Sequence, residues 1–451
     1  MGRFMREKNP EGYYVYYGPK RQYFNLPYGW KVLKNSTVDK LNADLPPVEE
    51  FVQSALLSPT SSARLKDMVN NETKIVVIVD DGTRSTPVSR ILPIVLSELE
   101  KGGADRDNID ILIALGTHRM MDKDDAVQRI GKDIHDTCRI NQHDCRADDL
   151  VSVGRLSTGG QTKINPLVAN ADVKIAIGSI LPHVMNGFGG GAKHIMPGVS
   201  NYEAIREHHL NFTPDPNCYI GNLKSNPFYL EVVRVAEAAG LDFIINCVYD
   251  SLEQIEHVVA GSLKEAHGKG VELSMKNYAF TLDQEADITI TSAFPYNEGP
   301  QIIKPLVPAA LLATKPGGSV IMTATCREDI PEGMLSAFDR VYRQNPPHAG
   351  LYARETFRRD RLFIEGAIDF NCAIYFALVC AARNRITIVS RDLKRQGIER
   401  MGFTYASSLE EALEDEEGRV PDAGVNIFPV GGLTLPLKGG PPDLFATAET
   451  T

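Results

Sequence analysis

Short apolar segments alternate with amphipathic segments along this chain, and the apolar segments end in polar turns. Residues 74–79 (KIVVIV) are the first strongly apolar segment, which predicts a buried strand. A polar turn, a helix predicted over 88–101 and a second strand predicted over 109–114 follow it. This order makes a βαβ unit, in which the strands are parallel and ligands bind at their carboxyl ends. The chain is therefore predicted to be an α/β protein with mostly parallel sheets.

The same alternation predicts two domains. Further strands are predicted over 172–178 and 242–248, and a second β/α series, which includes a helix predicted over 361–382, starts at residue 287. The tail, with Gly439 and Gly440, is predicted to be loop. A chain of 451 residues exceeds one typical core. We expect a first β/α domain over 1–280, to which the tail 420–451 could return, and a second over 281–419, with an active-site cleft between them. Residues 12–33 are predicted to form a small antiparallel hairpin or meander belonging to the first domain.

Composition restricts the partners and the compartment. The chain is 43% hydrophobic and 24% charged, as in ordinary soluble enzymes, and its net charge of −10 argues against nucleic acid and anionic membranes. No apolar run reaches the ~20 residues that span a bilayer. The seven cysteines are scattered without a CxxC pair, and no secretory signal begins the sequence. We expect a cytoplasmic protein with reduced thiols, and no oligomeric state is predicted.

A glycine-rich stretch, residues 181–209, carries the densest set of reactive side chains. Its three adjacent glycines, Gly189, Gly190 and Gly191, let the backbone approach a ligand closely, and their N–H groups could hold an anion. Lys193 follows as either a phosphate contact or a nucleophilic amine. Histidines on both sides could be acid–base groups or metal ligands. The alternative is an ordinary glycine-rich loop with a solvated lysine.

Polar turns after the predicted strands form the other candidate sites. The turn DDGTR contains Asp81, Gly82, Thr83 and Arg84, which could equally be a helix cap with a surface arginine. His118 in GTHR and His183 in LPH each follow a buried strand, so they should meet at the same sheet edge. In the second domain, Gln301 and Lys304 are three residues apart, so a helix would put both on one face, where they suit a carboxylate; the alternative is an exposed helix face. His135, His143 and Cys145 fit no standard zinc spacing and are interpreted as structural.

Taken in order, these motifs resemble the nickel-pincer lactate racemase family. The resemblance covers roughly residues 12–400 and rests on an ordered set of motifs: Asp81-x-x-Arg84, Gly116-Thr117-His118-Arg119, Pro182-His183, Gly189-Gly190-Gly191-Ala192-Lys193, Pro197-Gly198, His209 and Gln301-x-x-Lys304. Each motif is weak alone, but the ordered set is specific. The resemblance implies an isomerase, a racemase or epimerase of a 2-hydroxy acid.

The resemblance also implies a role for each residue. Lys193 would carry the nickel-pincer nucleotide, a Ni(II) pyridinium-3-thioamide-5-thiocarboxylic acid mononucleotide, through a thioamide bond, and His209 would be a nickel ligand. Asp81, Gly82, Thr83, Arg84 and the three glycines would line the cofactor. His118 and His183 would be the catalytic acid–base pair, while Arg84, Gln301 and Lys304 would bind substrate. Proteins of cofactor biosynthesis would be the partners.

The residue types suit such a reaction. The α-proton of a 2-hydroxy acid is too weakly acidic for a side chain to remove easily, so loss of hydride with loss of the hydroxyl proton is the easier route. It gives a planar 2-keto acid that can accept hydride on either face. One histidine for each face would then interconvert both enantiomers, because imidazole titrates near ~6.5 and can be acid or base at neutral pH.

The sequence departs from the family at the expected substrate pocket. Ser85 and Thr86 follow Arg84 where the family often has proline, and the family's second-domain tryptophan is missing. The one tryptophan is Trp30, and residues 361–363 (Arg-Leu-Phe) occupy the corresponding region. We therefore expect a larger or more polar substrate than lactate. Two alternatives remain: a pyridoxal-phosphate amino-acid racemase using Lys193, and a non-catalytic nucleotide- or metal-binding protein.

Overall fold

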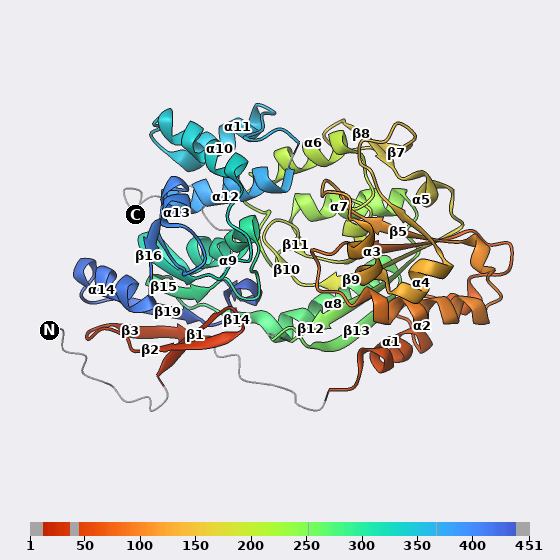
Figure 1. Ribbon diagram of the computed structural model, residues 1–451, viewed down its shortest axis with the longest axis horizontal. Coiled ribbons are helices and arrows are strands. Elements are labelled where there is room, and N and C mark those ends of the chain that lie inside the picture. The colour runs from red at the N-terminus through yellow and green to blue at the C-terminus, as the bar shows by residue number, and fades with distance from the viewer. Residues whose placement is uncertain (1–11, 37–44, 251, 367, 439–451) are drawn as a thin grey trace. The chain divides into compact units, whose positions relative to one another are not determined.

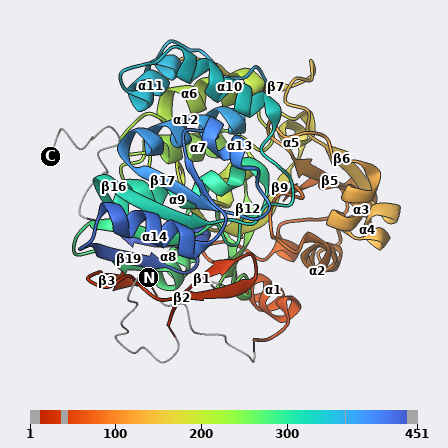
Figure 2. The same ribbon diagram turned by 60° about the vertical axis from the view of Figure 1, so that its left-hand side comes forward.

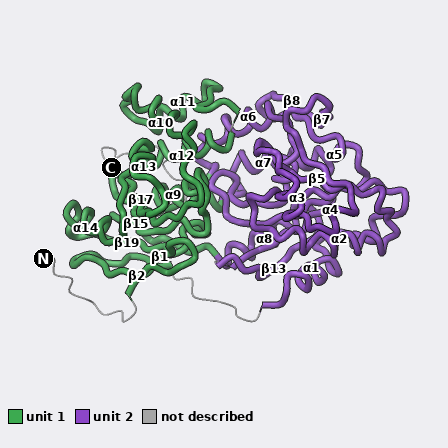
Figure 3. Tube along the Cα trace, in the orientation of Figure 1, with its two compact units in different colours: residues 1–40, 219–221, 278–451 green, residues 41–218, 222–277 purple. Residues whose placement is uncertain are grey.

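The computed structural model describes residues 12–36, 45–250, 252–366 and 368–438, and shows an α/β protein (Figure 1). The chain divides into two compact units, coloured separately in Figure 3. Unit 2 contains residues 41–218 and 222–277, and unit 1 contains residues 1–40, 219–221 and 278–451. No helix among the described residues has the length and apolar content needed to cross a membrane.

Unit 2 is built on a six-stranded sheet with the order β13-β12-β9-β4-β5-β6. All neighbours are parallel except β12 and β13, which are antiparallel. These strands are β4 (Ile75–Asp80), β5 (Ile109–Ala114), β6 (Arg139–Gln142), β9 (Val173–Ile180), β12 (Phe243–Tyr249) and β13 (Ile255–Gly261). Short antiparallel pairs lie outside the sheet: β7 (Val151–Arg155) with β8 (Gln161–Ile164), and β10 (Pro182–His183) with β11 (Gly187–Phe188).

Helices cover the sheet of unit 2. They are α1 (Val48–Leu57), η1 (Leu65–Asp67), α2 (Val88–Lys101), η2 (Arg106–Asn108), α3 (Lys123–Ile130), α4 (Lys132–Thr137), α5 (Pro166–Asn170), η3 (Gly191–His194), α6 (Tyr202–Phe212), α7 (Pro227–Ala238) and α8 (Leu263–Tyr278). Apolar side chains of α2 recur at helical spacing and pack with α1 against β4, β5 and β9 in one core. The short helix η3 packs directly against β9, which brings the glycine-rich stretch onto the sheet.

Unit 1 has its own sheet, with the order β18-β17-β16-β15-β19-β3 and parallel pairing throughout. Its strands are β3 (Lys31–Asn35), β15 (Ala286–Ser292), β16 (Thr314–Thr323), β17 (Arg385–Val389), β18 (Thr404–Ala406) and β19 (Gly424–Phe428). A hairpin of β1 (Tyr13–Tyr17) and β2 (Lys20–Phe24), and a parallel pair of β14 (Ala279–Thr281) and β20 (Leu435–Leu437), complete its strands.

The helices of unit 1 follow the same β/α alternation. They are η4 (Gly299–Ile302), α9 (Ile303–Pro308), the π-helical turn η5 (Ala309–Ala313), α10 (Glu332–Arg343), α11 (Ala349–Arg358), α12 (Ile368–Arg383), α13 (Arg395–Arg400), α14 (Leu409–Arg419) and η6 (Gly431–Leu433). Figures 1 and 2 both show α10 and α11 side by side at one end of this unit.

The predicted fold class is confirmed, and the predicted βαβ unit of β4, α2 and β5 has the expected parallel pairing. The domain assignment differs at the N-terminus. The predicted hairpin forms, but residues 12–36 belong to unit 1, because β3 pairs with β19 and Trp30 is buried in the core of unit 1. The tail likewise adds β19 and β20 to unit 1 and not to unit 2.

One predicted helix begins later than expected. The helix predicted over 361–382 begins at Ile368, because the side chain of Asn371 accepts hydrogen bonds from the backbone N–H groups of Phe363 (2.6 Å) and Ile364 (3.1 Å). Those contacts hold residues 363–364 in a turn. The glycines at 439–440, predicted to be loop, lie outside the described residues.

Burial of Trp30 predicts a measurable contribution to stability. Its side chain is 7% exposed and its indole N–H donates to the carbonyl of Val420 (2.9 Å), so Trp30→Ala should lower the free energy of unfolding by about 3–5 kcal/mol. Urea unfolding followed by circular dichroism measures this. Tyr28→Ala is the matched control, because Tyr28 is 74% exposed and its loss should cost no more than about 0.5 kcal/mol. Equal effects of the two substitutions would contradict the placement of Trp30.

Candidate functional site

The carboxyl ends of three neighbouring strands carry the polar turns that the sequence singled out. β4 lies between β5 and β9 in the sheet, and all three are parallel. The DDGTR turn follows β4, the GTHR turn follows β5, and Pro182-His183 follows β9. The backbone N–H of Gly116 donates to the carbonyl of Gly198 (2.9 Å), which ties the GTHR turn to the segment just after Lys193. The structure thus brings these predicted motifs to one edge of one sheet.

A buried arginine anchors the DDGTR turn. Arg129 of α3 forms an ion pair with the carboxylate of Asp80 and donates to the backbone carbonyls of Arg84 (3.0 Å) and Thr86 (2.7 Å). Burial lowers the pKa of Arg129 to about 10, so it remains a cation at neutral pH. The hydroxyl of Thr86 contacts both Asp80 (2.6 Å) and Ser179 on β9 (2.5 Å). These contacts fix the turn between β4 and β9.

Asp81 and His118 form a carboxylate–imidazole pair. Asp81 Oδ2 lies 2.5 Å from His118 Nδ1, and Asp81 Oδ1 accepts from the backbone N–H (2.9 Å) and hydroxyl (2.6 Å) of Thr83. Burial acts to raise the pKa of the Asp81 carboxyl, but the hydrogen bond and charge of His118, with those of Arg84 and Thr83, hold it well below its usual range. Because Asp81 is a carboxylate, Nδ1 of His118 must donate the hydrogen bond. A neutral His118 therefore has its lone pair on Nε2.

His183 is in contact with Lys193. Nε2 of His183 lies 2.8 Å from the Nζ atom of Lys193. On the other side of the ring, Nδ1 accepts hydrogen bonds from the backbone N–H groups of Met185 (3.2 Å) and Asn186 (3.1 Å). Both side chains are half-buried. The predicted candidate base and the predicted anchor lysine therefore share one contact at the carboxyl end of β9.

The three glycines pack closely but do not offer their N–H groups as predicted. The N–H of Gly189 donates to the carbonyl of Leu181 (2.7 Å), and that of Gly191 to the side chain of Asn246 (3.0 Å). At Gly190 the φ angle is +75°, and a Cβ there would approach the Ser179 carbonyl to 2.9 Å. The expectation of an anion cradle is therefore wrong for Gly189 and Gly191. Glycine is required here because the loop lies tightly against the sheet.

The buried pair His208 and His209 lies on α6. His209 Nδ1 lies 2.8 Å from the backbone carbonyl of Ile205, so Nδ1 carries the proton and Nε2 carries a lone pair. His208 Nε2 in turn donates to the carbonyl of Phe228 (3.1 Å). Burial, the neighbouring His208 and the charge of Lys193 together lower the pKa of His209 well below its usual value. His209 is therefore a neutral imidazole, electrostatically coupled to Lys193.

The remaining predicted contacts belong to unit 1. Gln301 lies on η4 and its side-chain amide approaches Glu298 Oε2 (3.4 Å). Lys304 lies on α9 with its ammonium group 4.8 Å from the centre of the Tyr296 ring. The two side chains are half-buried and sit on one continuous helical segment, which confirms the predicted helical spacing.

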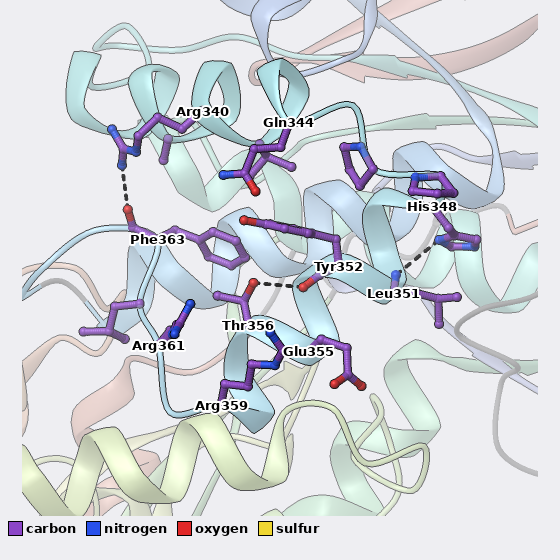
Figure 4. Close-up of a pocket in the computed structure, with 15 residues that line it drawn as sticks. Arg340, Gln344, His348, Leu351, Tyr352, Glu355, Thr356, Arg359, Arg361 and Phe363 are labelled. Atoms are coloured by element: carbon purple, nitrogen blue, oxygen red, sulfur yellow. Dashed lines mark hydrogen bonds between the residues drawn. The ribbon is translucent and has the colours of Figure 1, made fainter.

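A pocket of about 600 Å³ lies within unit 1, around residues 361–363 (Figure 4). Arg361 and Phe363 line it from the turn before α12, and Arg340 of α10 donates to the carbonyl of Phe363 (2.7 Å). Arg359 and Tyr352 line it from the region of α11. The pocket therefore combines aromatic rings with several guanidinium groups.

Several residues of the site were not identified from the sequence. Arg129, Asn246 and His267 act through contacts across the fold: His267 of α8 lies 2.9 Å from the carbonyl of Gly189. Their positions along the chain carry no motif that would have marked them. His143, interpreted as structural, is buried and contacts the carbonyl of Ser200 (2.9 Å), and no cluster of metal-binding side chains occurs among the described residues. All seven cysteines are free thiols.

Comparisons with known proteins agree on one family. Residues 17–221 match the model of the lactate racemase N-terminal domain. The chain is 31% identical over 391 residues to a lactate racemase of Thermoanaerobacterium thermosaccharolyticum, covering 85% of this chain and 89% of that protein. It is 33% identical over 285 residues to a lactate racemase of Lactiplantibacillus plantarum, covering 62% of this chain and 66% of that protein.

Solved structures show the same fold. The lactate racemase apoprotein of Thermoanaerobacterium thermosaccharolyticum superposes with a TM-score of 0.83 at 28% identity, covering 94% of this chain and 99% of that one. A protein from Thermotoga maritima shares the fold alone, with a TM-score of 0.61 at 18% identity, covering 87% of this chain and 99% of that one. Sequence and fold together show that this chain is an isomerase that belongs to the lactate racemase family.

Proposed function

We propose that this enzyme racemises or epimerises a 2-hydroxy acid larger or more polar than lactate, using a nickel-pincer nucleotide carried on Lys193. Two contacts in unit 2 support the proposal most directly: the Asp81–His118 pair and the His183–Lys193 pair, which stand at the ends of β4, β5 and β9. They support a proton acceptor and a nucleophilic amine at one sheet edge. Relatives described as lactate racemases support the reaction class.

The residues present fit this cofactor, which is the family's. Nickel requires a neutral imidazole ligand, and His209 is held neutral with its proton on Nδ1, so that Nε2 is free to bind metal. The charge of Lys193 also lowers the pKa of His209, which supports placing both residues at one site of unit 2. When bound, the cofactor supplies an electrophilic carbon that accepts hydride from the substrate reversibly. The Nε2–H group of the neighbouring His208 donates a hydrogen bond to the backbone carbonyl of Phe228, so His209 is the better nickel ligand.

His118 handles the hydroxyl proton in this proposal. Because Asp81 fixes the proton of a neutral His118 on Nδ1, the Nε2 atom can accept the substrate's hydroxyl proton as hydride leaves Cα. The Asp81 carboxylate then stabilises the imidazolium. Its own pKa is too low for it to take the proton itself. His118 returns the proton when the keto acid is reduced again.

His183 is the proposed acid–base residue for the opposite face of the keto acid. In the described conformation its Nδ1 is bound by two backbone N–H groups, so its proton lies on Nε2. Accepting a second proton requires the turn at Met185 and Asn186 to release Nδ1. Movement of that turn is therefore part of the cycle in which His183 acts as a base.

Substrate binding is assigned to three cationic or polar side chains. Arg84 is exposed beside the Asp81–His118 pair, with its guanidinium 3.1 Å from the hydroxyl of Thr83. We propose that Arg84 in unit 2, and Gln301 and Lys304 in unit 1, are substrate-binding residues. The arginine-rich pocket of unit 1 supports a tail larger or more polar than a methyl group. Trp30 cannot contribute to substrate binding, because it is buried in a core.

Covalent attachment is the first test of this function. Protein produced together with the cofactor-biosynthesis proteins should carry a mass adduct on Lys193, and Lys193→Arg should carry none, because its guanidinium is not a nucleophile at neutral pH. Intact-protein and peptide mass spectrometry measure this. An adduct on another lysine would contradict the assignment. A pyridoxal adduct with Schiff-base absorbance and no nickel would favour the amino-acid racemase alternative. An adduct in a protein that turns over no 2-hydroxy acid would favour the alternative of a non-catalytic nucleotide- or metal-binding protein.

Nickel content separates the metal ligand from the acid–base residues. His209→Ala should lose nickel from the loaded protein, since it removes one ligand, while His118→Ala should keep nickel and lose turnover by about 10²-fold or more. Inductively coupled plasma mass spectrometry with a racemisation assay measures both. His208→Gln is the matched control for burial on α6 and should retain most of the nickel. Full nickel in His209→Ala would overturn the ligand assignment.

The choice of substrate tests the pocket. In a panel of 2-hydroxy acids followed by loss of optical rotation, acids with longer or charged tails should show higher kcat/KM than lactate. Lys304→Ala should raise KM for every acid that turns over, because the carboxylate is common to all of them. Lactate emerging as the best substrate would refute the proposed tail preference without affecting the proposed reaction.

A further inference from the structure

The pocket of unit 1 lies between two helices that both pack on a third. One face of α10, with Arg340 and Val341, and one face of α11, with Tyr352, Glu355 and Thr356, line it (Figure 4). Both helices pack on α12. The volume of about 600 Å³ is within the range, roughly 300–1,000 Å³, of pockets that hold small organic molecules.

One wall of this pocket is fixed by contacts within unit 1. The backbone N–H of Phe363 donates to the side chain of Asn371 (2.6 Å), and its carbonyl accepts from Arg340 (2.7 Å). The ring of Phe363 lies 5.8 Å, between ring centres, from the buried ring of Phe357, which stacks on Tyr375 of α12. A wall held in this way needs little further ordering when a ligand binds.

Three guanidinium groups line the pocket without a carboxylate partner. They belong to Arg340, Arg359 and Arg361, and Figure 4 shows them around the rings of Tyr352 and Phe363. In the parts of the chain that the structure describes, none of the three forms an ion pair. The carboxylate nearest in sequence, between the second and third arginines, is not among the lining groups. Arginine stays charged at any physiological pH, so this positive charge is permanent.

The one carboxylate of the lining does not offset these charges. Glu355 lies 3.5 Å from Nη1 of Arg358 and 3.9 Å from Nε of Arg354, and neither arginine lines the pocket. Its charge is therefore balanced by arginines outside the lining. The pocket carries an excess of positive charge in a protein whose net charge is −10, which marks it as a place for an anion.

Apolar surface between the cations restricts the kind of anion. The rings of Tyr352 and Phe363 and the side chains of Val341, Leu351 and Leu362 also line the pocket. An inorganic ion would leave these surfaces without a partner. A ligand that carries acidic groups on an aromatic or aliphatic skeleton matches both parts of the lining, since a guanidinium binds a carboxylate through two parallel hydrogen bonds.

We propose that this pocket binds a small organic acid with two acidic groups, which Arg359 and Arg361 bind, while its apolar skeleton lies against Tyr352 and Phe363. Binding stands on the residues of unit 1 alone. Two sources share this chemistry. One is the substrate, in which case the inference rests on the proposed function and makes the substrate a 2-hydroxy acid with a second acidic group. The other is a separate regulatory ligand.

Isothermal titration calorimetry with isophthalate, a benzene ring with two carboxylates, tests the site on full-length protein at about 0.15 M NaCl. Isophthalate should bind with a Kd below about 1 mM. Isophthalamide, which has the same shape without charge, should bind at least about tenfold more weakly, because the guanidinium groups lose their charged partners.

Substitutions locate the bound acid. Arg359→Gln and Arg361→Gln should each weaken isophthalate binding by about tenfold or more, because each removes a charge-assisted contact. Arg343→Gln is the matched control: Arg343 is an exposed arginine of α10 outside the lining, and its loss should change the Kd less than about twofold. Glu355→Gln should tighten binding, since it removes the one carboxylate of the lining. Circular dichroism checks that each variant is folded.

The outcomes separate the inference from the proposed function. A Kd above about 1 mM, equal affinity for isophthalamide, or unchanged affinity in both arginine variants would overturn the inference. Isophthalate binding in a protein that gains no adduct on Lys193 would refute the proposed function alone, and an adduct without isophthalate binding the inference alone. In the loaded enzyme, competitive inhibition by isophthalate identifies the pocket as part of the substrate site, and any other kinetics identify a separate ligand.

Discussion

Burial of β4 on both faces is the constraint on which the site depends. A strand made of IVVIV has no polar side chain until it ends at Asp80, and its two parallel neighbours are largely apolar, with Asp110 near the start of β5 and Lys174 and Ser179 near the two ends of β9. Polar side chains are therefore found mainly where the strands begin and end. Parallel pairing makes β4, β5 and β9 end on one side, so the carboxylate, the histidines and the lysine gather there. The Asp80–Arg129 ion pair then fixes the turn on which Asp81 stands.

Much of the sheet of unit 2 and of the candidate site could be predicted from the sequence, because the sequence patterns that indicate them are local. Apolar segments and polar turns predicted the βαβ unit and the position of α2. The predicted ends of the strands identified Asp81, His118 and His183 as candidate site residues. Each of these depends on residues adjacent in the chain. The ordered motifs, which resemble those of one family, then predicted the reaction class that the comparisons support.

What could not be predicted depends on contacts between distant segments. The use of the Gly189 and Gly191 N–H groups depends on where Leu181 and Asn246 lie, and Asn246 is on another strand. The tautomer of His118 depends on its hydrogen bond with Asp81, which lies 37 residues away on another turn. The assignment of residues 12–36 to unit 1 depends on β19, near the opposite end of the chain. Aromatic alternation predicted the hairpin but carried no information about its partner.

That pairing of β3 with β19 sets the order in which the protein can mature on the ribosome. Residues 41–277 are synthesised as one nearly continuous stretch, so unit 2 can form its sheet while translation continues. Lys31 must wait for Gly424, which at typical elongation rates takes roughly 20–80 s. Throughout that time Trp30 and one edge of β3 have no final partner. Residues 12–36 therefore reach their final position only after most of the residues of both units have been synthesised.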